Sequence, residues 1–425
     1  MTFAEGVRET PEAPLSGVRV LDLGRMIAAP LCAWYLAGLG AEVLRVELPG
    51  GDSGWDLPPF VGPRGAHRGP RGSDDVSFSH LHRERGKRSL VIDYRTEAGR
   101  DLVLELCRNC NALIENYRPG VMASRGLGYE AVAEQNRALV YCSISGYGQY
   151  GPYRNRQGMD LLIQASSGMM SRTGESSGPP TKVGPTLCDQ SAAVFAALGI
   201  AAAVRSSEIT GHGRWLDVSL FDVAVAMLWD EPLDEYARVG FPERWGNQDP
   251  RSVPISTHRT RDGWITIVVT NDAQFSRLAD LIGFHELATR FPTRDLRVGA
   301  RVEIGQAIDR WASAVSTVEA ERALLDLDIP AGAVKPADVA KDDAHVDARG
   351  TLVPLRLFDG TTTPYVGPTL PLDFAGRPDL EPTETLGAST AEVLRQYLDL
   401  TSDELEALSR DGIIGSPTGV PAPGW

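Results

Sequence analysis

The segment that decides the fold reads Gly17-Val-Arg-Val-Leu-Asp-Leu23, continues as an apolar stretch over 28–40, and ends in Ala41-Glu-Val-Leu-Arg-Val-Glu-Leu48. The first and last parts are short and rich in valine and leucine, which predicts buried strands. The middle part is apolar along its whole length and ends in glycine, which predicts a buried helix. A strand, a helix and a strand in this order form a βαβ unit, whose strands pair in parallel.

The same alternation continues along the chain. Strands are predicted at 89–93, 112–115 and 138–145, with helices at 96–110 and 129–136 between and after them. A loop rich in glycine and proline then precedes an apolar helix at 191–205. This pattern predicts an α/β fold built on a largely parallel sheet.

A second region follows, over residues 221–335. It combines a strand at 264–269 with amphipathic helices, and Ser316-x-x-Glu319 predicts a capping box at the start of one of them. Short strands return at 352–358, and Thr401-x-x-Glu404 predicts the start of a late helix.

Composition excludes several classes of protein. The chain has 425 residues and a formal net charge of -14, whereas binding to nucleic acid or to a membrane surface needs a field of basic residues. Its five cysteines are sparse and odd in number, which indicates a reducing compartment and no disulfide framework. The apolar runs at 26–41 and 192–204 are shorter than the ~18–20 residues of a membrane span, and the first 14 residues do not resemble a signal peptide. We therefore predict a soluble, cytoplasmic protein.

Common motifs for cofactor chemistry are missing. The first strand leads into Leu23-Gly-Arg-Met-Ile-Ala-Ala-Pro30 and not into Gly-x-Gly-x-x-Gly, which argues against a nicotinamide enzyme. The sequence also holds no Walker loop and no His-Glu-x-x-His helix. Cys107-x-x-Cys110 lies in a predicted helix without a second pair, so we predict no metal site.

Two basic segments flank the predicted sheet. His82-Arg-Glu-Arg-Gly-Lys-Arg88 precedes one strand, and Asn116-Tyr-Arg-Pro-Gly120 follows another, with Arg125 close behind. Local cations on an acidic protein suit a ligand that carries phosphate groups. Solvated loops with surface ion pairs explain the same residues equally well.

Asp189 stands directly before the long apolar helix, and two interpretations fit it. Aspartate is a favoured N-cap residue. A helix N-terminus also stabilises a carboxylate and offers backbone N–H groups to a developing oxyanion, so Asp189 could act as a nucleophile on an acyl carbon. Cys188 competes for that role, but no histidine is near it in sequence, and we interpret it as structural.

Taken together, these segments resemble family III CoA-transferases of the CaiB/BaiF type, which include formyl-CoA and carnitine-CoA transferases. The resemblance spans nearly the whole chain and rests on the order of several segments. They are Gly17-Val-Arg-Val-Leu-Asp-Leu23, Leu39-Gly-Ala-Glu-Val-Leu-Arg-Val-Glu47, Arg85-Gly-Lys-Arg-Ser-Leu90, Glu115-Asn-Tyr-Arg-Pro-Gly-Val-Met122, Gly126-Leu-Gly-Tyr129, Ser145-Gly-Tyr-Gly-Gln149 and Gly211-His-Gly-Arg214.

The resemblance implies a mechanism and a set of contacts. Asp189 matches the catalytic aspartate, which attacks the thioester of a donor acyl-CoA and gives an acyl-aspartyl anhydride, then an aspartyl-CoA thioester, before CoA passes to the acceptor carboxylate. The residues implied to contact coenzyme A are Met26, Ile27, Ala28, Lys87, Asn116 and Tyr117, with Arg88, Arg118 and Arg125 as phosphate partners.

The sequence departs from the family pattern at three places. Leu48 replaces a basic residue, Ser124 replaces an arginine that here lies one place later as Arg125, and 245–252 shows no glycine-rich covering loop. The alternative within the superfamily is an α-methylacyl-CoA racemase, whose Gly-His-Asp is Gly158-Met159-Asp160 here. Because methionine carries no proton, the transferase is favoured. A CoA-binding protein without turnover is the second alternative.

The resemblance also implies an assembly. Residues 1–220 and 336–425 would form a large Rossmann-like CoA-binding domain, and 221–335 a smaller α/β domain. Two subunits would thread through one another as an interlocked homodimer.

Overall fold

The computed structural model describes residues 12–63 and 65–415, so the predicted domain limits at residues 1 and 425 lie outside the described part. The chain divides into two compact units. The first runs to Ser167 and also contains Gly184–Met227 and the chain from Asp347 onward. The second consists of Gly168–Val183 and Leu228–Val346. From the sequence, the second domain was instead predicted to begin at 221 and end at 335. The short segment 168–183 was not assigned to it.

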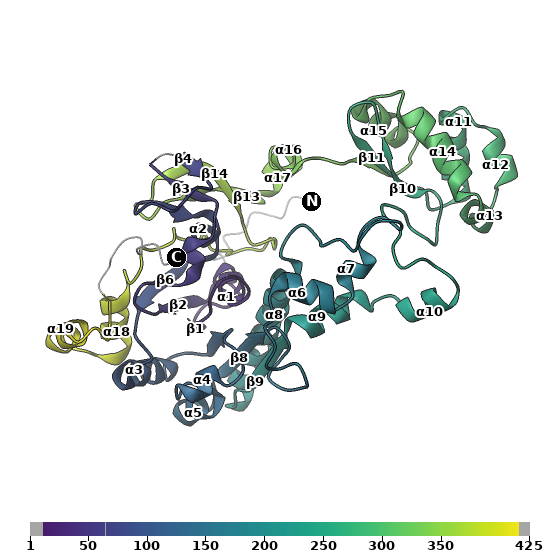
Figure 1. Cartoon of the computed structure of the whole chain (residues 1–425). Helices are drawn as coiled ribbons and strands as arrows, with labels where there is room; N and C mark the ends of the chain where they lie inside the picture. The colour runs from purple at the N-terminus through teal and green to yellow at the C-terminus, as the bar shows by residue number, and fades with distance from the viewer. Residues whose placement is uncertain (1–11, 64, 416–425) are drawn as a thin grey trace, which may run out of the picture. The chain divides into compact units, whose positions relative to one another are not determined.

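A six-stranded parallel sheet forms the centre of the first unit (Figure 1). Its spatial order is β6-β2-β1-β7-β8-β9, and every neighbouring pair is parallel. Numbered along the chain, these six strands lie in the order 3-2-1-4-5-6 that defines doubly wound, Rossmann-like sheets. The predicted α/β class and large parallel sheet are confirmed. The strands are β1 (Arg19–Asp22), β2 (Glu42–Glu47), β6 (Lys87–Val91), β7 (Ala112–Glu115), β8 (Val140–Ser145) and β9 (Trp215–Ser219).

Helices cover both faces of this sheet. On one face α1 (Ala28–Gly38) packs against β1, β2 and α8 (Leu187–Thr210), and α8 packs against β8 and β9. On the other face a single apolar core joins the strands to α3 (Glu97–Cys107), α5 (Tyr129–Gln135) and the late helices α18 (Thr390–Leu398) and α19 (Ser402–Arg410). The return of the chain end to the first unit is therefore secured by hydrophobic burial.

Helix α8 differs from its prediction as a buried helix. It is 24 residues long, and it is the only described helix long and apolar enough to cross a membrane, by length and composition alone. One face is buried against α1 and the sheet. The opposite face leaves Val194, Phe195, Leu198 and Ile209 between 47% and 67% exposed.

The second unit has its own sheet and core. Strands β10 (Ile255–Arg259), β11 (Trp264–Val268) and β12 (Ala331–Ala333) pair antiparallel. Helices α11 (Asp272–Leu281), α14 (Arg301–Ala312) and α15 (Thr317–Leu325) contribute to its apolar core. Both predicted capping boxes are present, at Ser316 with Glu319 and at Thr401 with Glu404.

The remaining elements are short. In the first unit they are β3 (Phe60–Gly62), β4 (Gly65–His67), β5 (Val76–Ser77), α2 (Phe78–Arg83), α4 (Val121–Ser124), α6 (Asp160–Ser166), α9 (Leu220–Leu228, which extends one residue into the second unit), β13 (Leu352–Arg356) and β14 (Thr362–Pro368), with a 3-10 turn at Ser53–Asp56. In the second they are α7 (Met169–Arg172), α10 (Leu233–Arg238), α12 (Glu286–Arg290), α13 (Arg294–Gly299) and α16 (Ala337–Ala340). Helix α17 (Ala344–Arg349) spans the second boundary. The returning strand β13 pairs with β14 in a separate hairpin and does not extend the parallel sheet.

A buried charge network lies at the carboxyl end of β1. The Arg45 guanidinium lies 3.3 Å from Asp22 and 3.0 Å from Asp52, and it also donates to the carbonyl of Gly24. The Lys87 ammonium lies 3.0 Å from Asp22 and 2.8 Å from Glu84. All of these charged side chains are at most 8% exposed. Burial would raise the pKa of Glu84, but Lys87 and Arg45 outweigh it and hold that pKa at about 2.

We predict that Arg45→Met destabilises the protein by about 3–5 kcal/mol, because it leaves buried carboxylates without their main cation. Arg88→Met is the matched control on the adjacent strand, since Arg88 is partly exposed and pairs with surface carboxylates; its expected cost is about 1 kcal/mol or less. Urea unfolding followed by tryptophan fluorescence measures both. Equal losses for the two variants would contradict the role given to the network.

Candidate active site

The loop after β1 is held from several directions. The amide of Gly24 donates to Asp22 at 2.9 Å, and the amide of Met26 donates to Asp52 at 2.8 Å. Arg83 donates to the carbonyl of Met26 at 2.6 Å. Met26 itself adopts a left-handed conformation with φ of 65°, which a side chain other than glycine rarely takes. The network therefore fixes an unfavourable backbone immediately before α1, a feature that is common at ligand sites.

Asn116 joins this loop to the next strand. It follows β7, and its side chain accepts from the amide of Arg25 at 2.7 Å and donates to the carbonyl of Arg25 at 2.8 Å. β1 and β7 are the neighbours at which the strand order reverses, and open α/β sheets bind ligands in the crevice at this switch point. The structure thus brings Met26, Ile27, Ala28 and Asn116 together at the expected edge.

Two tyrosines and Arg125 form a polar cluster beside Asn116. The hydroxyls of Tyr94 and Tyr117 lie 2.6 Å apart. The guanidinium of Arg125 lies 5.6 Å from the ring centre of Tyr94 and 5.0 Å from that of Tyr117. One terminal nitrogen of Arg125 is buried without a hydrogen-bond partner among the described residues. Arg118 is exposed and lines a pocket of about 290 Å³ with Arg154.

The four basic residues of the segment 82–88 contact four different parts of the structure. Arg83 contacts the Met26 loop, and Arg85 lines a different pocket. Lys87 is 4% exposed, and its ammonium already contacts Asp22, Glu84 and the Pro30 carbonyl. Arg88 pairs with Glu42 and Glu392 near the beginning of β2, so the structure does not bring it to the carboxyl edge.

Asp189 lies in the first turn of α8 and is not its cap. The N-cap is Thr186, so the interpretation of Asp189 as a capping residue is wrong. Within the described residues no donor hydrogen-bonds to its carboxylate, which is partly buried. Burial, followed by the negative charge of Asp160, raises the pKa of Asp189 to about 7, although Arg83 lowers it in part. Asp189 is therefore a poorly solvated carboxyl group whose pKa lies close to neutral pH.

Asp160 caps α8 from outside and was not singled out from the sequence. Its Oδ1 accepts from the amides of Cys188 at 2.7 Å and Asp189 at 3.4 Å, and its Oδ2 accepts from Gln164 at 2.7 Å. The amides expected to serve an oxyanion therefore already have an acceptor. Because Asp160 is 28 and 29 residues away from these amides, sequence spacing held no signal for the contact.

Two glycines make this contact possible. Gly146 directly follows β8, Gly158 lies two residues before Asp160, and a Cβ on Gly146 would approach the Cα of Gly158 to 2.4 Å. Only glycine at both places allows the two backbone segments to approach so closely. The approach delivers the Asp160 carboxylate to the start of α8.

Cys188 is unsuited to nucleophilic attack. Its side chain is buried, and burial together with Asp160 and Asp189 raises the pKa of the thiol to about 12. At neutral pH it is therefore un-ionised, whereas the thiolate is the nucleophilic form.

Comparison with known proteins identifies the family. The family model described as CoA-transferase family III matches residues 15–387. The chain belongs to family III of the CoA-transferases. The succinate–glutarate CoA-transferase of Agrobacterium fabrum is 35% identical over 389 residues, which cover 90% of this chain and 95% of the relative. The succinyl-CoA–D-citramalate CoA-transferase of Chloroflexus aurantiacus is 32% identical over 96% of this chain and 99% of the relative.

Solved structures agree with this assignment. A CAIB/BAIF family protein from Brucella suis superimposes with a TM-score of 0.80 at 31% identity, covering 91% of this chain and all of that one. The protein is thus a family III acyl-CoA:carboxylate CoA-transferase, and the recognition made from sequence is confirmed. Membership of this family implies CoA thioesters as substrates.

We predict that ionisation of Asp189 lowers the stability of the folded CoA-transferase. The folded-state pKa is about 7 against an ordinary value of 3.8, so the folded state binds the proton more tightly and loses stability as pH rises through this window. Asp189→Asn should therefore be more stable than the wild type above pH 7 and similar to it near pH 4. Chemical denaturation at several pH values measures this.

The control is Asp295→Asn, because the Asp295 side chain is 91% exposed and its replacement should change the stability only slightly at pH 8. A wild type as stable as Asp189→Asn at pH 8 would show that Asp189 has an ordinary pKa.

Proposed function

We propose that the enzyme moves CoA from an acyl-CoA donor to a carboxylic acid through covalent intermediates on Asp189. The observation that carries this proposal is the Asp189 carboxylate itself, which is partly buried, has a raised pKa and has no hydrogen-bond donor among the described residues. A carboxylate so poorly stabilised gains more from bond formation than a solvated one.

The proposed reaction begins with attack of an Asp189 oxygen on the thioester carbonyl. The carbon–sulfur bond breaks, CoA leaves as the thiolate, and an acyl-aspartyl anhydride remains. The thiolate then attacks the Asp189 carbonyl carbon and releases the donor acid, which gives an aspartyl-CoA thioester. The acceptor carboxylate attacks that thioester, and the thiolate released in this step attacks the acceptor's carbonyl, which restores free Asp189. Each step exchanges one acyl bond for another, so no ATP is required.

We propose that CoA binds at the switch point of the sheet. Met26, Ile27 and Ala28 present the backbone at the beginning of α1, and Asn116 holds that backbone through Arg25. Tyr117 is placed beside them, while Arg118 and Arg125 are candidates for the phosphate groups. In this proposal Lys87 does not contact CoA but positions Asp22, which holds the loop after β1. Arg88 does not contribute to the site, because it pairs with Glu42.

The relatives suggest the class of acceptor. Their names specify succinate with glutarate, succinyl-CoA with L-malate, and acetyl-CoA with oxalate. We propose that the acceptor here is also a dicarboxylate. A racemase is disfavoured because the residue before Asp160 is Met159, which is 63% exposed and carries no proton.

We propose that two subunits associate through the apolar face of α8. Its exposed residues Val194, Phe195 and Leu198 belong to the first unit, as do Leu161 and Leu162 of α6, which packs against α8. Adjacent exposed apolar residues of this kind mark protein interaction sites. This supports a homodimer, for which the family resemblance implies interlocked chains; light scattering that finds a monomer would contradict it.

We predict that Asp189→Ala lowers the transfer rate at least about a thousandfold while CoA binding is retained. Asp189 should also carry an adduct after acyl-CoA is added, which hydroxylamine trapping and peptide mass spectrometry detect. Asp295→Ala is the control and should transfer CoA normally. An adduct on Cys188, or undiminished transfer by the alanine variant, would overturn the assignment. Binding of CoA without any transfer by the wild type would favour a binding protein.

We further predict that two neighbours move the acid limb of the pH–rate profile in opposite directions. Transfer needs ionised Asp189, so the rate should fall as pH decreases through about 7. Asp160→Asn removes a negative neighbour and should move the limb to lower pH, whereas Arg83→Gln removes a positive one and should move it to higher pH. A displacement of one pH unit changes the rate on the acid side about tenfold. Three superimposable profiles would show that Asp189 does not set the limb.

A further inference from the structure

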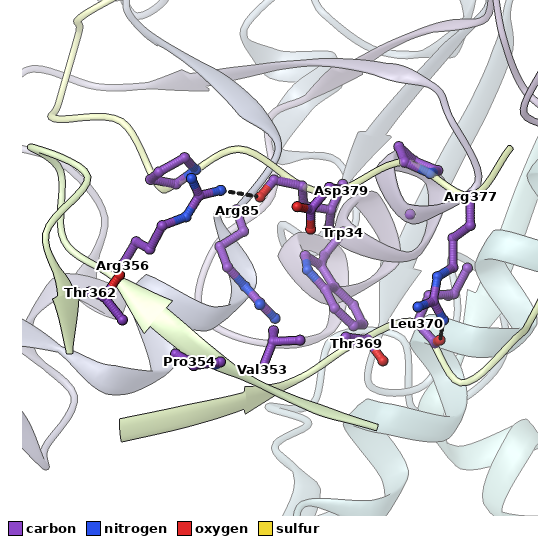
Figure 2. A pocket seen from close by; sticks show the side chains of 14 residues that line it. Trp34, Arg85, Val353, Pro354, Arg356, Thr362, Thr369, Leu370, Arg377 and Asp379 are labelled. Carbon is purple, nitrogen blue, oxygen red and sulfur yellow. Dashed lines mark hydrogen bonds between the residues drawn. The ribbon is translucent and has the colours of Figure 1, made fainter. Parts of the chain in front are cut away.

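A second cavity lies in the first unit, and its lining does not include Asp189. It has a volume of about 420 Å³ and is lined by α1, the segment after α2 and the β13–β14 hairpin (Figure 2). Trp34 and Gly38 bring the later part of α1 to its wall, whereas the CoA edge lies at Ala28. At 1.5 Å rise per residue, Gly38 is about 15 Å along the helix from Ala28. The cavity is therefore distinct from the proposed active site.

Positive charge dominates this cavity. Its lining contains Arg85, Arg356 and Arg377 but only one carboxylate, that of Asp379. Arg356 donates to the Leu380 carbonyl at 3.2 Å, and Arg377 donates to backbone carbonyls at 3.3 and 3.4 Å. Among the described residues neither arginine has a carboxylate within salt-bridge distance. The charges are thus held in place by neutral groups and are not neutralised by them.

Arg85 is the buried member of the three and is 6% exposed. Burial lowers its pKa to about 10; Asp379 opposes this effect, and the nearby positive charge of Arg356 adds to it. Its side chain contacts His82 at 2.9 Å and the carbonyl of Pro368. A buried guanidinium next to a second one is costly unless an anion joins them.

The middle of the cavity is partly apolar. Figure 2 shows Arg356 and Arg377 on opposite sides, with Trp34 and Arg85 between them. Val353 and Asp379 also lie in this middle part, whereas Leu370 lies beside Arg377. The indole nitrogen of Trp34, on a side chain only 2% exposed, has no hydrogen-bond partner among the described residues. Cationic groups at two sides, with the Trp34 ring and Arg85 between them, match a molecule with acidic groups at both ends of a short hydrocarbon chain.

We propose that this cavity is a second binding site for a small dicarboxylate, held by Arg356 and Arg377 at its two ends and by Arg85 between them. Guanidinium groups suit this ligand because their planar donors match carboxylate oxygens in pairs. The volume lies in the range of small-molecule sites.

Calorimetric titration of the full-length protein with succinate, glutarate, butyrate and inorganic phosphate tests the proposal. We expect a dicarboxylate to bind saturably and at least about tenfold more tightly than butyrate, which has a single carboxylate. Arg356→Gln and Arg377→Gln should each weaken that binding about tenfold, as the loss of a charge-assisted contact does. Arg85 is left unchanged because it is buried and its replacement could unfold the protein.

Two variants keep the outcome specific. Arg322→Gln removes an arginine whose side chain is 84% exposed and should bind like the wild type. Asp189→Ala should also bind like the wild type, which separates this site from acceptor binding at the active site. Unchanged affinity in both Arg356→Gln and Arg377→Gln, or no saturable dicarboxylate binding, would overturn the proposal. Tighter binding of phosphate than of every dicarboxylate would overturn the ligand class.

Discussion

The site depends on the buried contact between Arg45 and the carboxylates of Asp22 and Asp52. Asp22 at the end of β1 and Asp52 at the start of the 3-10 turn after β2 would repel one another, and the guanidinium allows both to remain buried. Once placed, they accept from the amides of Gly24 and Met26 and so impose the left-handed turn at Met26. The buried charges within the sheet thereby fix the conformation of the loop that follows β1 at the sheet's edge.

The second requirement is a carboxylate that remains reactive at the start of a helix. Helix N-termini usually stabilise anions and so lower their reactivity. Here Asp160 occupies the first amides of α8, and Asp189 lies beside this negative charge instead of receiving those hydrogen bonds. Arg83 partly compensates and also donates to the Met26 loop, so it links the proposed nucleophile to the proposed CoA edge.

Much of this could be predicted from the sequence. The parallel strands from β1 to β8 follow from apolar periodicity, whereas β9 was not predicted. The capping boxes at Ser316 and Thr401 follow from side-chain chemistry at fixed spacing. The order of motifs identified the family. Asp160 could not be found in this way, because its contact with α8 depends on the backbone approach of Gly146 to Gly158. The sequence also could not predict that Arg85, Lys87 and Arg88 have different partners. Their contacts depend on which side of the chain each residue faces.

The opposite orientation of neighbouring basic side chains on β6 limits how the protein can evolve. Lys87 and Arg88 are adjacent on β6, so one faces the buried network and the other faces the surface. Because Leu90 and Val91 pair with β2, inserting or deleting one residue between Arg88 and Leu90 would exchange these faces, placing a strongly bound ammonium in solvent and an arginine in the core. Substitutions in this segment alter one charge at a time, whereas a change in length alters all of them together. The number of residues in β6 should therefore vary less among descendants of this chain than the residues themselves.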